Sequence, residues 1–245
     1  MDIKMLEAVP PWDWPQDAAE LILATITDRV AAPSVRLLAA TLAGECTVVR
    51  DDMAAALLSV AADVGEPEQL RCLAAISLGP AFEYYHTMPD DNVGMSAQAY
   101  ARAQERLQSL FLQESVPTRV RRSVLEASIR GPQTWHAEAI RDAYEAGGEW
   151  RHTAVFCMRF IHGFDQLIVE ALLSDDPQTK LQAVHAAGAW ELQEAWPEVR
   201  RLMTGRRPDK PLLLAAIESA GSIPAHDARA LLSRFAEDAD EDVAS

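Results

Sequence analysis

Short apolar sequence motifs with helical spacing, called words below, recur along the chain. In residues 33–44, which read PSVRLLAATLAG, apolar side chains follow the i, i+3, i+4, i+7 spacing that places them on one face of a helix. Similar words follow with a period of about 33 residues, interrupted by one longer and one shorter interval, which is typical of an array of small repeats. The glycines at which these words end are Gly44, Gly79, Gly131, Gly163, Gly188 and Gly221.

Each word carries signals for the start and the end of a helix. Four words begin at or near a proline, which is tolerated in the first turn because the backbone N–H that it lacks has no partner there. We expect the closing glycines to adopt the left-handed conformation that often ends a helix. Small pairs such as Ala39–Ala40 predict that neighbouring helices approach closely. The four prolines are Pro33, Pro67, Pro117 and Pro177.

A second amphipathic segment precedes each word. We call the word the inner helix and the segment before it the outer helix. Such a pair cannot bury its apolar face alone, but pairs stacked side by side can. The pattern therefore predicts an all-α, right-handed α-α superhelical solenoid of about six helical hairpins plus a terminal helix, forming one domain over residues 1–245. The outer helices are expected at about 17–28, 51–62, 96–113, 134–146, 164–173, 194–204 and 225–236.

The words VRLLAATLAG and LRCLAAISLG resemble the HEAT-repeat family, in the variety called PBS-lyase-like HEAT repeats, and the resemblance extends from about residue 17 over nearly the whole chain. Arg36, Arg71 and Lys180 lie where such repeats often carry arginine. The resemblance implies that these residues form a structural ladder, paired with acids of neighbouring turns. It also implies an alternative function, that of an enzyme or lyase subunit handling bilin pigments.

Three segments depart from the regular pattern. Residues 1–16, with Trp12 and Trp14, are expected to cap the open apolar end of the first hairpin. Residues 80–116 form an enlarged unit, in which AFEYYHTMPDDNVG predicts a long loop of the kind that often binds partners. Residues 237–245 are expected to be a frayed or truncated end.

Composition narrows the partner class. The chain is 49% hydrophobic and 24% charged, as in a folded soluble protein, and its net charge of −15 disfavours nucleic acid and anionic membranes. No stretch reaches the roughly 20 apolar residues that span a bilayer. The three cysteines are far apart, which is typical of reduced thiols in a cytoplasmic protein.

One basic region stands out in this acidic chain. Residues 100–130 hold six arginines against three glutamates. Guanidinium groups suit carboxylates, so we expect an acidic protein or peptide partner here. Two other interpretations stay open: arginines paired with local glutamates, or a DNA-repair glycosylase of the HEAT-like kind, although those spread cations along the whole solenoid. The candidate partner contacts are Arg102, Arg106, Arg119, Arg121, Arg122, Tyr84 and Tyr85.

Catalytic chemistry has weak signals. Glu83 with His86, and Glu149 with His152, have the i, i+3 spacing that lets one helix offer two ligands to a metal. Iron-binding HEAT-repeat hydroxylases use adjacent His-Glu pairs instead, and the chain has none. A nucleophile elbow and a Gly-rich phosphate loop are also missing. We therefore predict a non-catalytic scaffold or adaptor without cofactor, which binds its partner on the inner helices; the oligomeric state stays open.

Overall fold

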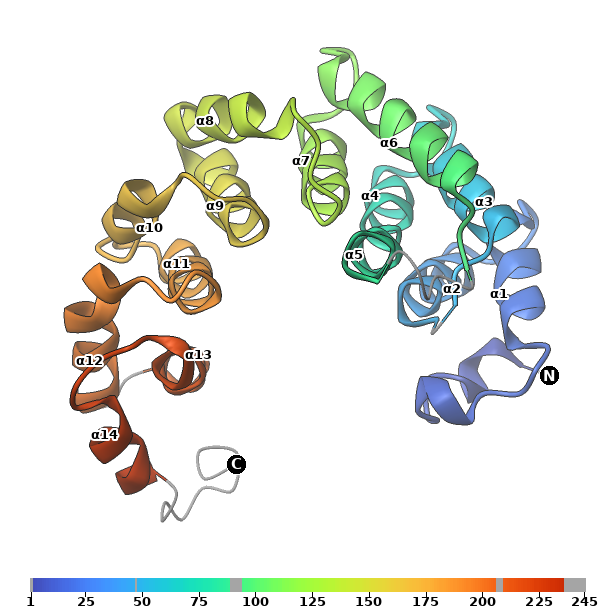
Figure 1. Cartoon of the computed structure of the whole chain (residues 1–245). Helices are drawn as coiled ribbons and strands as arrows, with labels where there is room; N and C mark the ends of the chain where they lie inside the picture. Colours follow the sequence, from blue (N-terminus) through green and yellow to red (C-terminus); the bar gives the residue numbers. More distant parts are fainter. Residues whose placement is uncertain (1, 47, 89–93, 206–208, 236–245) are drawn as a thin grey trace. The chain divides into compact units, whose positions relative to one another are not determined.

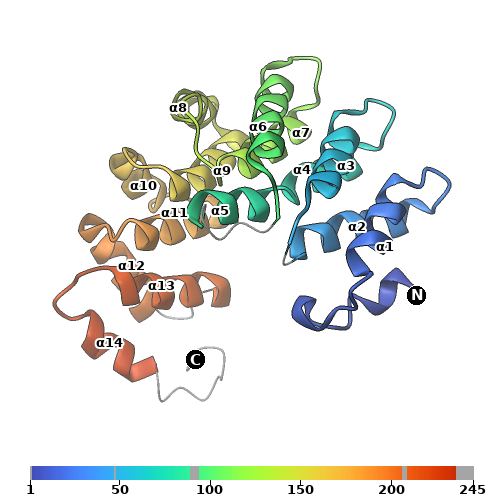
Figure 2. The same cartoon turned by 45° about the vertical axis from the view of Figure 1, so that its right-hand side comes forward.

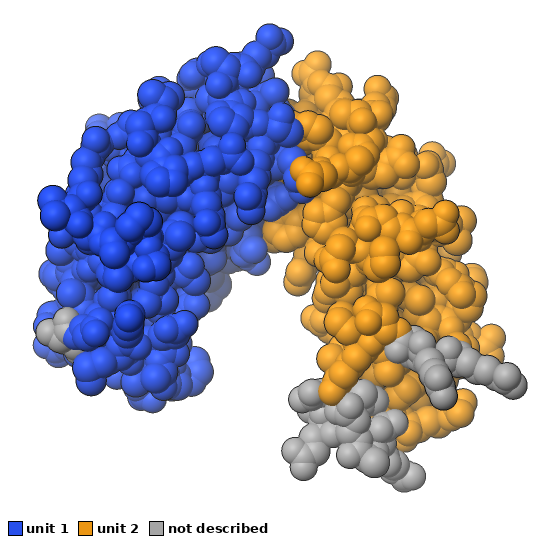
Figure 3. Space-filling view, turned by 180° about the vertical axis from the view of Figure 1, so that it is seen from behind, with its two compact units in different colours: residues 1–133 blue, residues 134–245 orange. Residues whose placement is uncertain are grey.

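The structure, a computed structural model, describes residues 2–46, 48–88, 94–205 and 209–235. Within these ranges the regular elements are all helices, without a β-strand, so the all-α prediction is confirmed. The chain divides into two compact units, Met1–Gln133 and Thr134–Ser245 (Figure 3).

Unit 1 stacks three helix pairs. Helix α1 packs on α2, α3 on α4, and α6 on α7. Helices α1, α3 and α6 lie side by side as an outer row, and α2, α4 and α7 as an inner row (Figure 1). Short 3-10 helices at Ile3–Met5 and Pro11–Asp13 precede them. The bounds are α1 Ala18–Thr27, α2 Pro33–Glu45, α3 Asp51–Ala62, α4 Glu68–Ile76, α5 Gly79–Thr87, α6 Ala97–Leu112 and α7 Thr118–Ser128.

Unit 2 repeats the arrangement. Helix α8 packs on α9, α10 on α11, and α12 on α13, while α9, α11 and α13 form its inner row (Figure 2). The bounds are α8 His136–Ala146, α9 Gly148–Cys157, the 3-10 helix η3 Met158–Phe160, α10 Asp165–Ala171, α11 Pro177–Ala189, the 3-10 helix η4 Gln193–Ala195, α12 Trp196–Thr204, α13 Lys210–Ser222 and α14 Ala228–Phe235. Each predicted outer helix has a counterpart within a few residues.

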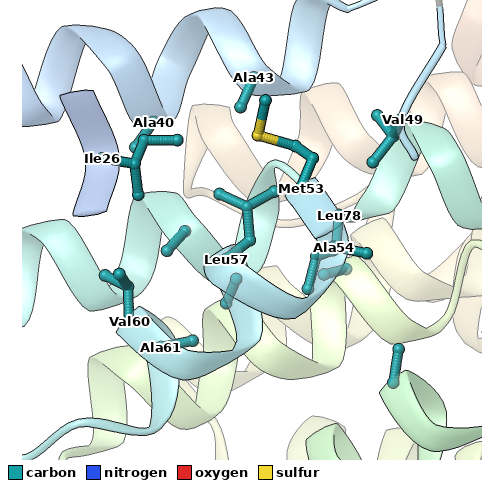
Figure 4. Packing of buried hydrophobic residues seen from close by; sticks show 14 of the residues in the cluster. Ile26, Ala40, Ala43, Val49, Met53, Ala54, Leu57, Val60, Ala61 and Leu78 are labelled. Atoms are coloured by element: carbon teal, nitrogen blue, oxygen red, sulfur yellow. The ribbon is translucent and has the colours of Figure 1, made fainter. Parts of the chain in front are cut away.

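Small and branched apolar residues fill the core of unit 1. Met53 and Leu57 of α3 point toward Ala40 and Ala43 of α2 (Figure 4), and all four are buried. Burying a leucine such as Leu57 stabilises a fold by about 1.5–3 kcal/mol. The alanines add little area, but they let α2 lie close to its neighbours.

The closing glycines behave differently from the prediction. Of the six, Gly163 alone has a positive φ, so the left-handed assignment is wrong for the others. Gly44 and Gly188 lie inside helices and serve close approach. A Cβ on Gly188 would lie 2.9 Å from the Cα of Ser219, and one on Gly44 would lie 3.2 Å from the Cα of Ser77.

Each of these serines bonds back to the helix it touches. The Ser77 hydroxyl donates to the Ala40 carbonyl at 2.6 Å, and the Ser219 hydroxyl donates to the Val184 carbonyl at 2.9 Å. Both acceptors lie four residues before the glycine that the serine contacts. The two contacts, Gly44–Ser77 and Gly188–Ser219, are therefore the same device, one in each unit.

The enlarged segment begins as a helix. The predicted loop, residues 81–94, is wrong for residues 81–87, which belong to α5, Gly79–Thr87, directly after α4. Phe82 is buried edge-on against the Tyr100 ring, and Tyr85 stacks on the same ring at 4.1 Å. Residues 89–93 of the predicted loop, and the predicted frayed segment 237–245, lie outside the described residues.

The first residues cover one end of unit 1. Ile3 and Leu6 are buried, and the Trp14 indole N–H donates to the carbonyls of Leu6 at 3.1 Å and Val9 at 2.8 Å. Trp12 is 77% exposed, so it covers little of the first hairpin.

Candidate functional site

A row of arginines joins the inner helices of unit 1 to the outer ones. Arg36, Arg71 and Arg121 each donate Nε–H to a carbonyl ten residues earlier, at 3.0, 3.0 and 2.7 Å. The acceptors lie in the last turn of the preceding outer helix, where carbonyls have no partner within the helix. The arginines thus cap the outer helices. The acceptors are Ile26, Ala61 and Phe111.

Arg121 is one of the partner contacts that the sequence predicts. Besides capping α6, its guanidinium lies over the Phe111 ring, 5.4 Å from the centroid. Arg121 is four residues after the N-cap residue of its helix, as Arg36 and Arg71 are. Counting from the helix start, rather than back from the closing glycine, would have found it in the sequence.

The acid partner that was expected for the ladder is present at Arg36. Its two terminal nitrogens bind the two oxygens of Glu66 at 2.7 and 2.8 Å, and both side chains are buried. The Arg36 hydrogen bond lowers the pKa of Glu66. Arg71, only 4% exposed, leaves Nη2 buried without a partner. Lys180 is half-buried in unit 2. The hydrogen bond from Arg201 lowers the pKa of Glu198, and the charge of Lys180 adds a smaller effect in the same direction.

Helix α7 presents basic residues alongside α4 and α5. Arg119, Arg122 and Glu126 recur at helical spacing and therefore share one face of α7, and Arg130 follows two residues after the end of that helix. Arg130 Nη1 binds Glu83 Oε2 of α5 at 2.9 Å. Burial raises the pKa of the Cys72 thiol in α4. The charge of Arg119, at the other end of this face, opposes that rise. We call Arg119, Arg122 and Arg130 the α7 basic face.

An exposed apolar stripe runs along α4 and α5. Ile76, Tyr84 and Met88 are 39%, 41% and 46% exposed, although each is large and apolar. With the exposed Pro80 they recur every four residues, at the end of α4, within α5 and at the residue that follows α5. We call these four residues the α4–α5 stripe. Helices α4 and α5 both pack against α7, so the stripe and the α7 basic face lie on neighbouring helices.

The remaining candidate contacts lie elsewhere. Tyr85 turns toward Tyr100, as described above. Arg102 and Arg106 are exposed on α6 of the outer row. Hydrogen bonds from Ser96 lower the pKa of Asp51, and the charge of Arg102 lowers it further. The structure therefore places Arg119 and Arg122 on α7 and Tyr84 on the neighbouring α5. Arg102 and Arg106 lie on α6, and Arg121 and Tyr85 contact other residues.

The metal-type pairs have other surroundings. Glu83 is bound by Arg130, and His86 is exposed at the end of α5. In unit 2, Glu149 is exposed, and His152 has a buried Nδ1 without a partner. Among the residues that the structure describes, no three His, Cys, Asp or Glu side chains lie together as a metal site requires.

No protein-family model and no curated protein matches the chain. Its fold is similar to the crystal structure of YibA from Escherichia coli, with a TM-score of 0.50 and 15% sequence identity over 96% of this chain and 81% of YibA. At this identity the likeness concerns the helical fold alone. Within the described ranges no helix is both long and apolar enough to cross a membrane.

Proposed function

We propose that the chain is a HEAT-like repeat protein, a right-handed solenoid of about six hairpins in one domain, that acts as a non-catalytic cytoplasmic adaptor. Support for the repeat assignment comes from the stacked helix pairs, the capping arginines of unit 1 and the Gly–Ser contact that is found once in each unit. Free cysteines at positions 46, 72 and 157 are consistent with a reducing compartment.

The partner surface is the α4–α5 stripe together with the α7 basic face. The observation that carries this proposal is the exposure of Ile76, Tyr84 and Met88 beside a helix rich in arginine. An amphipathic helix would lay its apolar side on the stripe, as helices do when they bind in apolar grooves. Carboxylates flanking that apolar side would reach Arg119 and Arg122.

A protein partner suits this surface better than nucleic acid. The net charge of −15 repels a phosphate backbone at long range. Acidic residues also lie among the arginines, with Glu83 bound to Arg130 and Glu126 on the same face of α7.

The test is a charge reversal with a matched control. Arg119→Glu with Arg122→Glu reverses two charges on the inner row, and Arg102→Glu with Arg106→Glu reverses two on the outer row. Arg121 stays unchanged because it caps α6. A fluorescein-labelled acidic amphipathic peptide, followed by anisotropy at low and moderate salt, serves as the probe, and proteins captured from lysate are compared between the two variants.

We expect the inner-row variant to weaken peptide binding by about tenfold or more, since each charge-assisted hydrogen bond contributes about 1.5–3 kcal/mol. The outer-row variant should bind nearly as the original chain does. Equal losses in both variants would indicate general electrostatic attraction, and unchanged binding in both would rule out the arginines as partner contacts. Circular dichroism checks that both variants keep their helices.

A further inference from the structure

Unit 2 has a small polar pocket on its inner row. Arg159 of η3, His185 of α11, and Glu218 and Ser222 of α13 line it, with Gly188 and Ser219 between the two long helices. Its volume is about 110 Å³. Pockets for drug-sized ligands hold about 300–1,000 Å³, so this one admits the end of a single side chain.

Two contacts build the pocket. The Trp190 indole N–H donates to the Met158 carbonyl at 2.7 Å, which holds η3, and hence Arg159, beside the end of α11. The Gly188–Ser219 contact brings α11 and α13 together. His185 lies three residues before Gly188, and Glu218 lies next to Ser219. Residues of three elements are therefore held in place by contacts other than those of Arg159, His185 and Glu218.

The charges of the pocket balance. Arg159 is positive, and Glu218, whose side chain is 70% exposed, is negative. Burial lowers the pKa of His185, and the charge of Arg159 lowers it further, while Glu218 acts in the opposite direction. His185 is therefore neutral at physiological pH. Arg159 of η3 and Glu218 of α13 are the charged groups that act on the His185 imidazole.

The tautomer of His185 follows from its neighbour. Nδ1 lies 3.6 Å from Glu218 Oε2, which is too long for a hydrogen bond, but the carboxylate still favours the proton on Nδ1. Nε2 is then an acceptor. The pocket thus offers a cationic donor at Arg159, a neutral acceptor at His185 and a hydroxyl at Ser222.

We propose that this pocket binds a primary carboxamide, the end of an Asn or Gln side chain of a bound peptide. The carboxamide oxygen accepts from Arg159, and its NH₂ group donates to His185 Nε2. Because the charges of Arg159 and Glu218 oppose each other, neither an anion nor a cation gains a net attraction, and a neutral group that both accepts and donates hydrogen bonds fits best. The proposal concerns unit 2 and is independent of the surface proposed for unit 1.

The experiment uses the full chain and blocked tripeptides with an acetyl group at one end and an N-methylamide at the other. The central residue is Gln, Glu, Lys or Met, and free glycine is added as a zwitterionic probe. Binding is followed by NMR through the ring signals of His185, which are assigned with the His185→Gln variant. Arg159→Gln tests the donor, and Arg229→Gln, an exposed arginine on α14, is the matched control.

We expect the Gln peptide to bind with a Kd in the millimolar range and at least about fivefold more tightly than the other probes, the gain expected from one hydrogen bond. Arg159→Gln should weaken it about fivefold, and Arg229→Gln should not. Acidification should abolish binding, because protonated His185 no longer accepts.

Other outcomes overturn the proposal. Tighter binding of the Glu peptide would make the pocket an anion site, and tighter binding of the Lys peptide would make it a cation site at Glu218. Preference for glycine would point to a zwitterion. Equal binding of Gln and Met peptides, or none at about 10 mM, would remove carboxamide recognition altogether.

Discussion

The inner rows of the two units share one feature and differ in another. Both units have the Gly–Ser contact, at Gly44–Ser77 and at Gly188–Ser219. The arginines that are buried within the described ranges, Arg36 and Arg71, both lie in unit 1. In unit 2 the residue at the corresponding position of α9 is Arg151, which is exposed, although its Nε still donates to the Tyr144 carbonyl at 3.3 Å.

This difference separates two contributions to stacking. Close approach of inner helices requires a residue without a side chain, and both units supply it. An arginine can cap the outer helix whether its side chain is buried or exposed, and whether or not an acidic side chain pairs with it. Even within unit 1, Arg36 meets Glu66, the residue before Pro67, whereas the residue before Pro117 is the apolar Val116. Arg71 therefore has no acid in the place where Arg36 has one.

The largest effect is expected at Arg36. Arg36→Met removes both hydrogen bonds to the buried Glu66 carboxylate, which keeps only Arg29 Nε at 3.9 Å, and should lower the free energy of unfolding by about 3 kcal/mol. Urea denaturation followed by circular dichroism measures it. Arg151→Met in unit 2 is the control and should change the free energy by less than about 1 kcal/mol. Similar losses in both variants would mean that the two ladders are equivalent after all.

The next effect tests the shared contact. Gly188→Ala places a Cβ 2.9 Å from backbone of α13 and should cost about 2 kcal/mol through overpacking. Gly44→Ala meets Ser77 at 3.2 Å and should cost less. In Gly221→Ala the new Cβ has nothing within 4 Å, so this control should be neutral or stabilising by up to about 1 kcal/mol. A destabilised Gly221→Ala, or a harmless Gly188→Ala, would contradict the close-approach argument.

A smaller effect depends on pH. Because the pKa of Glu66 is lowered in the folded chain, its stabilisation is complete above the unfolded value of about 4.3 and is lost as the pH falls through the folded value. At neutral pH, Glu66→Gln should therefore have a free energy of unfolding about 1–2 kcal/mol lower than that of the original chain, and should unfold at a lower temperature. Thermal melts should show this gap closing below about pH 4. A gap that is constant with pH would show that the charge of Glu66 contributes nothing.

The smallest effect is expected at Arg71. Arg71→Met removes the hydrogen bond to Ala61, but it also removes the buried Nη2 that has no partner. These changes oppose each other, so the free energy of unfolding should change by no more than about 1 kcal/mol. A loss as large as that of Arg36→Met, measured in the same urea experiment, would reveal a partner for Nη2.

The sequence predicted most helices because their periodicity is local. The outer helix expected at about 51–62, for example, is α3, Asp51–Ala62. The prediction from the sequence failed at α5 because Gly79 and Pro80 suggest the end of a helix. Pro80 instead lies in the first turn of a new helix, where proline is tolerated. The candidate site was found as a group of arginines, but adjacent helical residues point in different directions. Arg119 and Arg121 therefore serve different surfaces.

By itself the sequence determined where helices form, how they pair, and that the pairs must stack, because the 3.6-residue period and the apolar content of each segment are local properties. Only the tertiary structure decided which glycines turn the chain and which admit a neighbouring serine, and which arginines are buried. Those outcomes depend on residues about 30 positions apart that meet only when one helix pair packs on the next.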